Sequence, residues 1–206
     1  IDKYDKEVRD GNFKSNAKKI KTFEMLNKNI LIAGFGRIGK KLISRCLAFD
    51  TKVYVYDPYV DEKIIKDNGG IKVNSIIEGL KIADYVSLHM PLTKDTKNLI
   101  DYSILKQMKK NAIIVNTARG GIINEIDLDK ALNEDLIFGA GLDVFEKEPI
   151  NLNNPLLKNK KVVLSPHSAT FTDECTSRMG IETTKNIIDF FENKIDKSMI
   201  VKLWLI

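Results

Sequence analysis

The sequence predicts an α/β fold in which a doubly wound parallel sheet carries helices on both faces. Short apolar segments alternate with segments of helical period, and several of these apolar segments have no polar face. A glycine-rich turn joins the first apolar segment to a helical pattern. Alternation of this kind is typical of parallel strands joined by crossover helices, which bury both faces of the sheet.

Strands are expected at residues 29–34, 52–57, 71–74, 84–90, 112–118, 137–144 and 161–166. Apolar residues at helical spacing between them predict helices at Ile38, Leu42, Cys46 and Phe49, at Ile104, Leu105 and Met108, and at Leu128, Ala131 and Leu132. After Pro166, either Thr172 or Asp173 can cap a long helix, on which Ile181, Thr184, Ile188 and Phe191 share one face. That face requires a partner surface.

The length of 206 residues fits one domain with appendages. We expect a polar arm or connector at 1–23, the sheet domain at 24–170, and a C-terminal helix and tail at 171–206. The first residue is Ile1, and neither an apolar leader nor a cleavage site follows it. We therefore expect a cut or incompletely represented chain with no secretory signal.

The composition favours a soluble cytoplasmic protein. Hydrophobic residues make up 43% of the chain, and no segment reaches the roughly 20 apolar residues that a membrane helix needs. Cys46 and Cys175 lie far apart without metal-ligand spacing, which indicates reduced thiols and no metal site. The net charge of +5 is spread along the chain, so we expect no nucleic-acid partner.

The turn "GFGRIG" predicts a dinucleotide-binding, Rossmann-type unit. In such a unit the first glycine (Gly34) permits the turn and the second (Gly36) lets a pyrophosphate approach the backbone. The third (Gly39) lets the helix pack closely on the strand, and the helix N-terminus favours phosphate. The next strand ends at Asp57, whose carboxylate can bind an adenine ribose and repel a 2′-phosphate, which favours NAD over NADP. The alternative for Asp57 is a turn residue before Pro58.

Ligands bind outside the carboxyl ends of parallel strands, and several polar residues follow such ends. Hydride transfer to a 2-keto acid requires a cation for the carboxylate and carbonyl oxygen, which Arg119 can supply. It also requires an acid, which His167 can be if a carboxylate supports its charged form. Asp143, Glu146 and Glu148 are the candidates for that carboxylate. Arg119 and His167 can instead be surface and loop residues, and His89 is better explained as a structural loop residue.

Six segments together resemble a known family: "GFGRIG", "YDP", "LHMPLTKDTKNLI", "IIVNTARGGIINE", "GAGLDVFEKEP" and "SPHSAT". In order and spacing they are similar to the signature segments of the D-isomer-specific 2-hydroxyacid dehydrogenases, over roughly residues 24 to 190. The resemblance implies that Arg119 and His167 are catalytic and that Glu148, directly before proline, supports the histidine. It implies these further cofactor contacts: Arg37, Ile38, Asp57, Met90, Thr117, Ala118 and Asp143.

The resemblance also implies NAD as cofactor, a small 2-hydroxy or 2-keto acid as substrate, and a homodimer formed through the cofactor domains. Phosphoglycerate dehydrogenases are the most similar group, on the segment "NTARGGIINE" and the long loop before His167. Members of the family carry a further substrate domain, completed by the C-terminal helix, and nothing precedes the connector in this sequence. Two alternatives follow from that difference: an NADH-sensing interaction module without turnover, and a folded remnant without activity.

Overall fold

The computed structural model describes residues 2–12, 21–197 and 200. The chain forms two compact units, residues 1–164 and residues 165–206. The first unit contains the parallel sheet, and the second contains one long helix. The predicted division at residue 170 stays a prediction.

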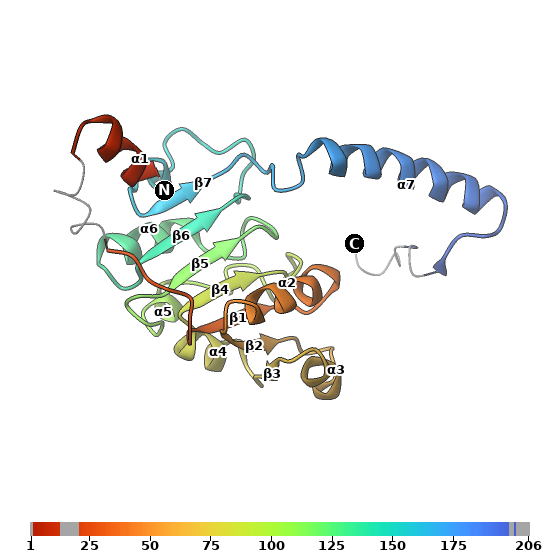
Figure 1. Ribbon diagram of the computed structural model, residues 1–206, viewed down its shortest axis with the longest axis horizontal. Coiled ribbons are helices and arrows are strands. Elements are labelled where there is room, and N and C mark those ends of the chain that lie inside the picture. Colours follow the sequence, from red (N-terminus) through yellow and green to blue (C-terminus); the bar gives the residue numbers. More distant parts are fainter. Residues whose placement is uncertain (1, 13–20, 198–199, 201–206) are drawn as a thin grey trace. The chain divides into compact units, whose positions relative to one another are not determined.

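The sheet of the first unit has seven parallel strands in the order β3-β2-β1-β4-β5-β6-β7 (Figure 1). The strands are β1 (Asn29–Ala33), β2 (Lys52–Tyr56), β3 (Ile71–Lys72), β4 (Tyr85–Leu88), β5 (Ile113–Asn116), β6 (Gly139–Leu142) and β7 (Val162–Leu164). Because all are parallel, their carboxyl ends meet at one edge of the sheet. The winding reverses between β1 and β4, which is where ligands bind in sheets of this kind.

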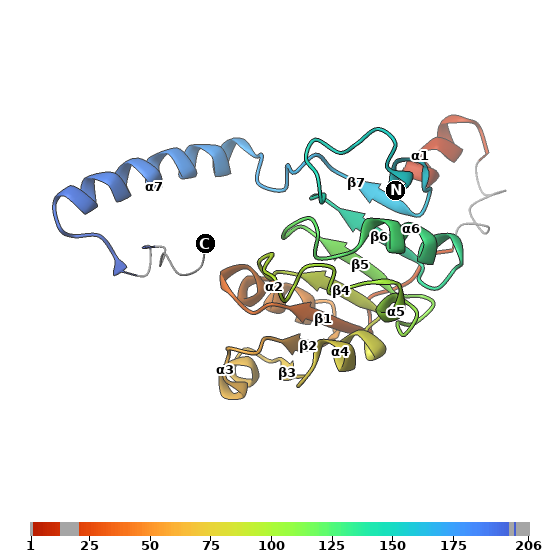
Figure 2. The same cartoon turned by 180° about the vertical axis from the view of Figure 1, so that it is seen from behind.

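Helices cover both faces of the sheet, which confirms the doubly wound fold (Figures 1 and 2). One face carries α2 (Arg37–Leu47) and α3 (Glu62–Asp67), and the other carries α4 (Ile76–Ile82), α5 (Tyr102–Leu105) and α6 (Glu125–Asn133). A short helix, α1 (Asp2–Arg9), opens the chain, and a 3₁₀ turn, η2 (Pro155–Lys158), follows α6 and β6. The sequence did not predict α1.

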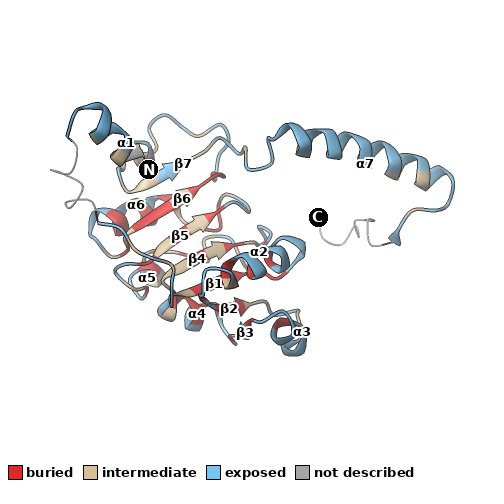
Figure 3. Cartoon of the chain, viewed as in Figure 1, coloured by how far each residue is buried: buried red, intermediate tan, exposed pale blue. Residues whose placement is uncertain are grey.

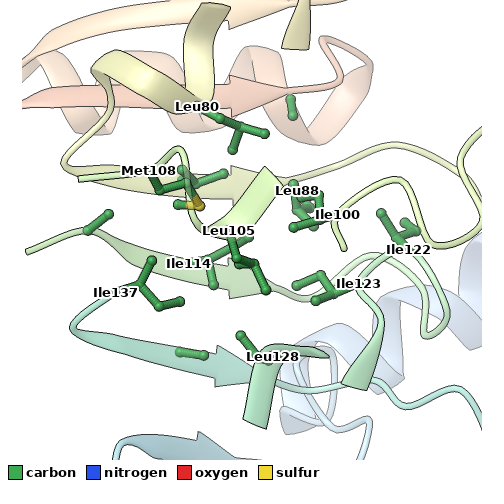
Figure 4. Packing of buried hydrophobic residues seen from close by; sticks show 14 of the residues in the cluster. Leu80, Leu88, Ile100, Leu105, Met108, Ile114, Ile122, Ile123, Leu128 and Ile137 are labelled. Carbon is green, nitrogen blue, oxygen red and sulfur yellow. The ribbon is translucent and has the colours of Figure 1, made fainter. Parts of the chain in front are cut away.

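Alternate residues of β1 divide between two hydrophobic cores. Leu31 and Ala33 belong to the larger cluster, which also contains residues of α4, α5 and α6 and lies on the face of the sheet that these helices cover (Figure 4). Ile30 and Ile32 belong to the smaller cluster with Ile43 and Cys46 of α2. This alternation follows from the two-residue period of a strand.

Each strand lies within its predicted range and is shorter than predicted. The first predicted helix differs more: α2 ends at Leu47, so Phe49 lies outside it and is exposed, contrary to the prediction. The turn that follows places Asp50 in the left-handed region, with φ of 53°. The buried face of α2 consists of Gly39, Ile43 and Cys46, so of the predicted set Cys46 is buried as expected, whereas Ile38 is exposed.

The second unit consists mainly of α7 (Asp173–Phe191), which confirms the predicted long helix. Of the two candidate caps, Thr172 caps the helix, because its side chain accepts a hydrogen bond from the Cys175 N–H. None of the residues of α7, all of which the structure describes, is buried (Figure 3). No helix in the described segments is long and apolar enough to cross a membrane.

Leu88 of β4 tests how much the larger core contributes to stability. Its side chain is 0% exposed and lies among the clustered residues in Figure 4, so Leu88→Ala should lower the free energy of unfolding by about 2–5 kcal/mol. The matched control is Leu152→Ala, at a residue that is 85% exposed and should change it by less than about 0.5 kcal/mol. Urea denaturation measures both, and equal effects would contradict the assigned core.

Candidate functional site

Gly34 and Gly39 permit two close backbone approaches at the end of β1. Gly34 has a φ of 100°, and a Cβ atom there would lie 2.6 Å from the carbonyl carbon and oxygen of His89. A Cβ atom on Gly39 would lie 2.3 Å from the carbonyl oxygen of Gly34. The turn is therefore packed against the end of β4 on one side and against the first turn of α2 on the other.

Gly36 faces open space instead. It is the N-cap of α2, its cap has no side-chain hydrogen bond, and a Cβ atom there would meet nothing within 4 Å. The first amides of a helix lack intrahelical acceptors, and the helix dipole favours an anion at this end. The first turn of α2 contains no acidic residue, and Ile38 in that turn is 67% exposed. The uncapped helix end thus fits a phosphate group.

Asp57 connects the end of β2 to the glycine turn. Its Oδ2 atom accepts a hydrogen bond of 2.7 Å from the Phe35 N–H, and its Oδ1 atom accepts one of 2.9 Å from the Tyr59 N–H. A carboxylate oxygen has two lone pairs, so each can accept a further hydrogen bond. Asp57 is therefore both a support of the turn and a candidate acceptor for ribose hydroxyls.

Asn116 shapes the loop that carries Thr117, Ala118 and Arg119 after β5. The Asn116 side chain is buried, accepts a hydrogen bond of 3.0 Å from the Ala118 N–H and donates one of 2.9 Å to the Arg119 carbonyl. The Asn116 carbonyl also accepts a 3.0 Å hydrogen bond from the N–H of Asp143, a buried residue after β6. Asn116 was not among the predicted site residues, although an Asn side chain that bonds the backbone two residues on is a known turn signal.

Gly120 joins this loop to the loop that carries Glu148. A Cβ atom on Gly120 would lie 1.8 Å from the Phe145 carbonyl oxygen and 2.6 Å from the Glu146 amide nitrogen. The Glu148 carboxylate in turn accepts a 2.9 Å hydrogen bond from the Phe145 N–H through Oε1. The loops that carry Arg119 and Glu148 are thus in direct contact, and Arg119 is exposed at its position.

His89 and Met90 follow β4 beside the glycine turn. The His89 Nε2 atom lies 2.8 Å from the Ser87 Oγ atom, and partial burial lowers the pKa of the imidazole. A lowered pKa keeps the ring neutral at neutral pH. Met90 is buried, and its amide nitrogen would lie 2.9 Å from a Cβ atom on Gly34.

His167 belongs to the second unit, whereas the other predicted site residues belong to the first. Ser165 and Pro166 separate it from the end of β7, and its own N–H donates a 3.1 Å hydrogen bond to the Ser165 carbonyl. The His167 backbone lies in the left-handed region, with φ of 53°.

The parallel sheet, the glycine turn and the uncapped helix end define a nucleotide-binding domain of the doubly wound class. Residues 1–169 match the family described as D-isomer specific 2-hydroxyacid dehydrogenase, NAD binding domain. The chain therefore belongs to that family, as the signature segments predicted.

Individual relatives agree with this assignment. The chain is 37% identical over 198 residues to a glyoxylate reductase from Korarchaeum cryptofilum, covering 95% of this chain and 59% of the relative. It is 38% identical over 183 residues to a D-3-phosphoglycerate dehydrogenase from Methanocaldococcus jannaschii, covering 89% of this chain and 35% of the relative. The chain thus spans only part of the length of these relatives.

Among solved structures, the chain is similar to a D-lactate dehydrogenase from Aquifex aeolicus, complexed with NAD and lactic acid. The TM-score is 0.82 with 30% sequence identity, covering 93% of this chain and 61% of the other.

Gly34 and Gly36 should respond differently to replacement by alanine. Gly34→Ala should lower the free energy of unfolding by at least about 1–3 kcal/mol, because the residue needs a positive φ and its Cβ would collide with His89. Gly36→Ala meets no atom and should cost less than about 1 kcal/mol, the cost of a poorer N-cap. Urea denaturation measures both, and a larger loss for Gly36→Ala would contradict the geometry of the turn.

Proposed function

We propose that this chain forms the NAD-binding and catalytic part of an NAD-dependent oxidoreductase that acts on D-2-hydroxy acids. One observation carries the proposal: Gly120 packs against the Phe145–Glu146 peptide and so holds the Arg119 loop against the Glu148 loop. Both loops follow the carboxyl ends of strands, at the same edge of the sheet as the glycine turn. A cation, a carboxylate and an uncapped helix end at one edge suit the recognition of NAD and an acidic substrate.

The proposed cofactor contacts surround the glycine turn and the neighbouring strand ends. Gly36 and the first amides of α2 would bind the pyrophosphate, Asp57 the adenine ribose, and Ile38 would cover the nucleotide. The remaining proposed contacts are Gly34, Arg37, Gly39, Met90, Thr117, Ala118 and Asp143. When bound, NAD supplies the nicotinamide ring that accepts the hydride from carbon 2 of the hydroxy acid.

The chain's own residues would supply binding and proton transfer. Arg119 would hold the substrate carboxylate and the oxygen on carbon 2 through its guanidinium group. His167 would take the hydroxyl proton as the hydride leaves, and return it in the reverse reaction. Glu148 would favour the protonated form of His167, because a nearby negative charge stabilises an imidazolium. The products are then a 2-keto acid, NADH and one proton.

Phosphoglycerate is the first substrate that we propose, since the chain is similar to relatives named D-3-phosphoglycerate dehydrogenase. The resemblance of the segment "NTARGGIINE" to that group supports the same choice. We also propose a cytoplasmic homodimer. On the face that carries α2 and α3, Ile113 and Val115 of β5 are only half-buried and Val163 of β7 is 74% exposed. A second copy of the domain that packed there would cover this apolar part of the sheet.

The cofactor assignment predicts tight binding of NADH and weaker binding of NADPH. Asp57 should repel the 2′-phosphate and lower the affinity for NADPH by about tenfold or more. Gly36→Ala should lower the affinity for NADH by a similar factor, because its methyl group fills the space proposed for the pyrophosphate. Fluorescence titration measures both.

The matched control is Gly180→Ala in α7, where an added Cβ also meets no atom within 4 Å. That variant should bind NADH as the unaltered chain does. Failure of the unaltered chain to bind either nicotinamide cofactor would contradict the proposal and favour the inactive remnant.

The catalytic assignment predicts that Arg119→Ala lowers kcat by about a hundredfold or more while the affinity for NADH is retained. The assay is NADH oxidation against phosphohydroxypyruvate, hydroxypyruvate, glyoxylate and pyruvate. Arg45→Ala, at an exposed arginine of α2, is the control and should turn over normally. Unchanged turnover in Arg119→Ala would overturn the assignment, and NADH binding without turnover of any acid would favour the NADH-sensing module.

A further inference from the structure

Glu125 is a buried carboxylate to which the proposed reaction gives no role. It is the first residue of α6 and is 8% exposed. Its Oε1 atom accepts a 2.6 Å hydrogen bond from the Glu146 N–H, and its Oε2 atom accepts one of 2.5 Å from the Asn154 side-chain amide. Both donors belong to the loop that follows β6 and contains Glu148.

The two consecutive amides at Phe145 and Glu146 are held by two different carboxylates. The Phe145 N–H donates to Glu148, and the Glu146 N–H donates to Glu125. Gly120 packs against the same peptide, and the Phe145 side chain is buried in the larger core. Glu148 is thus bonded to the Val144–Phe145 peptide, and Glu125 anchors the next peptide, at the other side of Phe145.

At position 125 a carboxylate accepts the two hydrogen bonds with two separate oxygens, and a glutamine has only one such oxygen. The Glu146 N–H is always a donor. Asn154 cannot turn its amide around at no cost, because its Oδ1 atom already accepts a 3.0 Å hydrogen bond from the Leu156 N–H and caps η2. A glutamine would place an amide donor against one of these two donors. The N-terminus of α6, with Asn124 as its cap, also favours the negative charge of Glu125.

We infer that Glu125 is a positioning residue for Glu148: by anchoring the Phe145–Glu146 peptide, it keeps the Glu148 carboxylate in the conformation that the proposed reaction requires. This inference rests on the proposed function, in which Glu148 supports the proton-carrying histidine. It differs from a merely structural role, because loss of Glu125 should lower kcat while the affinity for NADH is retained in a chain that is still folded.

The test is kcat for NADH oxidation by the full chain with the four 2-keto acids named above, measured beside the affinity for ADP-ribose. Glu148→Gln should lower kcat by about tenfold or more, and Glu125→Gln should lower it by at least about threefold. The affinity for ADP-ribose should stay unchanged in Glu125→Gln, since the glycine turn is intact. Glu134→Gln is the control, at an exposed residue that caps the other end of α6 and bonds the Tyr102 hydroxyl.

A second variant, Asn154→Ser, provides the test if Glu125→Gln does not fold. Serine retains an oxygen that can cap η2 but removes the amide that donates to Glu125. If Glu148→Gln lowers kcat while Glu125→Gln and Asn154→Ser leave it unchanged, the inference is overturned and the proposed function stands. If Glu148→Gln itself leaves kcat unchanged, or the unaltered chain turns over none of the acids, the proposed role of Glu148 is wrong, and the inference fails with it.

Discussion

Contact between backbones at the carboxyl edge of the sheet is the constraint on which the rest of the site depends. Gly34 brings the turn after β1 against the end of β4, and Gly120 brings the loop after β5 against the loop after β6. In both places a single Cβ atom would lie within 3 Å of a neighbouring carbonyl group, so the approach requires glycine. A parallel sheet aligns its strand ends but does not join the loops that follow them, and these glycines allow the loops to meet.

Carboxylates then hold the backbones that the glycines bring together. Asp57 accepts from the Phe35 N–H in the glycine turn, Glu148 from the Phe145 N–H, and Glu125 from the Glu146 N–H. Hydrogen bonds from an amide to a charged acceptor are stronger than neutral ones, which suits loops that must keep one conformation. Two of these acidic residues, Asp57 and Glu148, are also proposed ligand or catalytic groups, so support and chemistry share the same side chains.

The sequence allowed the prediction of the main features that depend on local pattern. The strands of the sheet, the glycine turn and the cap at Thr172 are encoded by apolar period, by glycine spacing and by residue type over a few positions. Phe49 was misplaced because apolar spacing alone does not show where a helix ends, and here the chain turns at Asp50. The predicted roles of Arg119 and His167 come from motif resemblance and stay predictions.

The role of Glu125 could not be predicted from the sequence, because its hydrogen-bond partners lie far from it along the chain. Glu125 lies 21 residues from Glu146 and 29 from Asn154, so neither contact leaves a spacing signal. Glu125 also stands in the first turn of a helix, where an acidic residue is ordinary and exposed, and only its burial under a distant loop distinguishes it. A carboxylate that is buried must be compensated by donors, because an uncompensated charge is costly to remove from water. The two donors come from the loop that carries Glu148, and the charge at position 125 and the order of that loop therefore depend on each other.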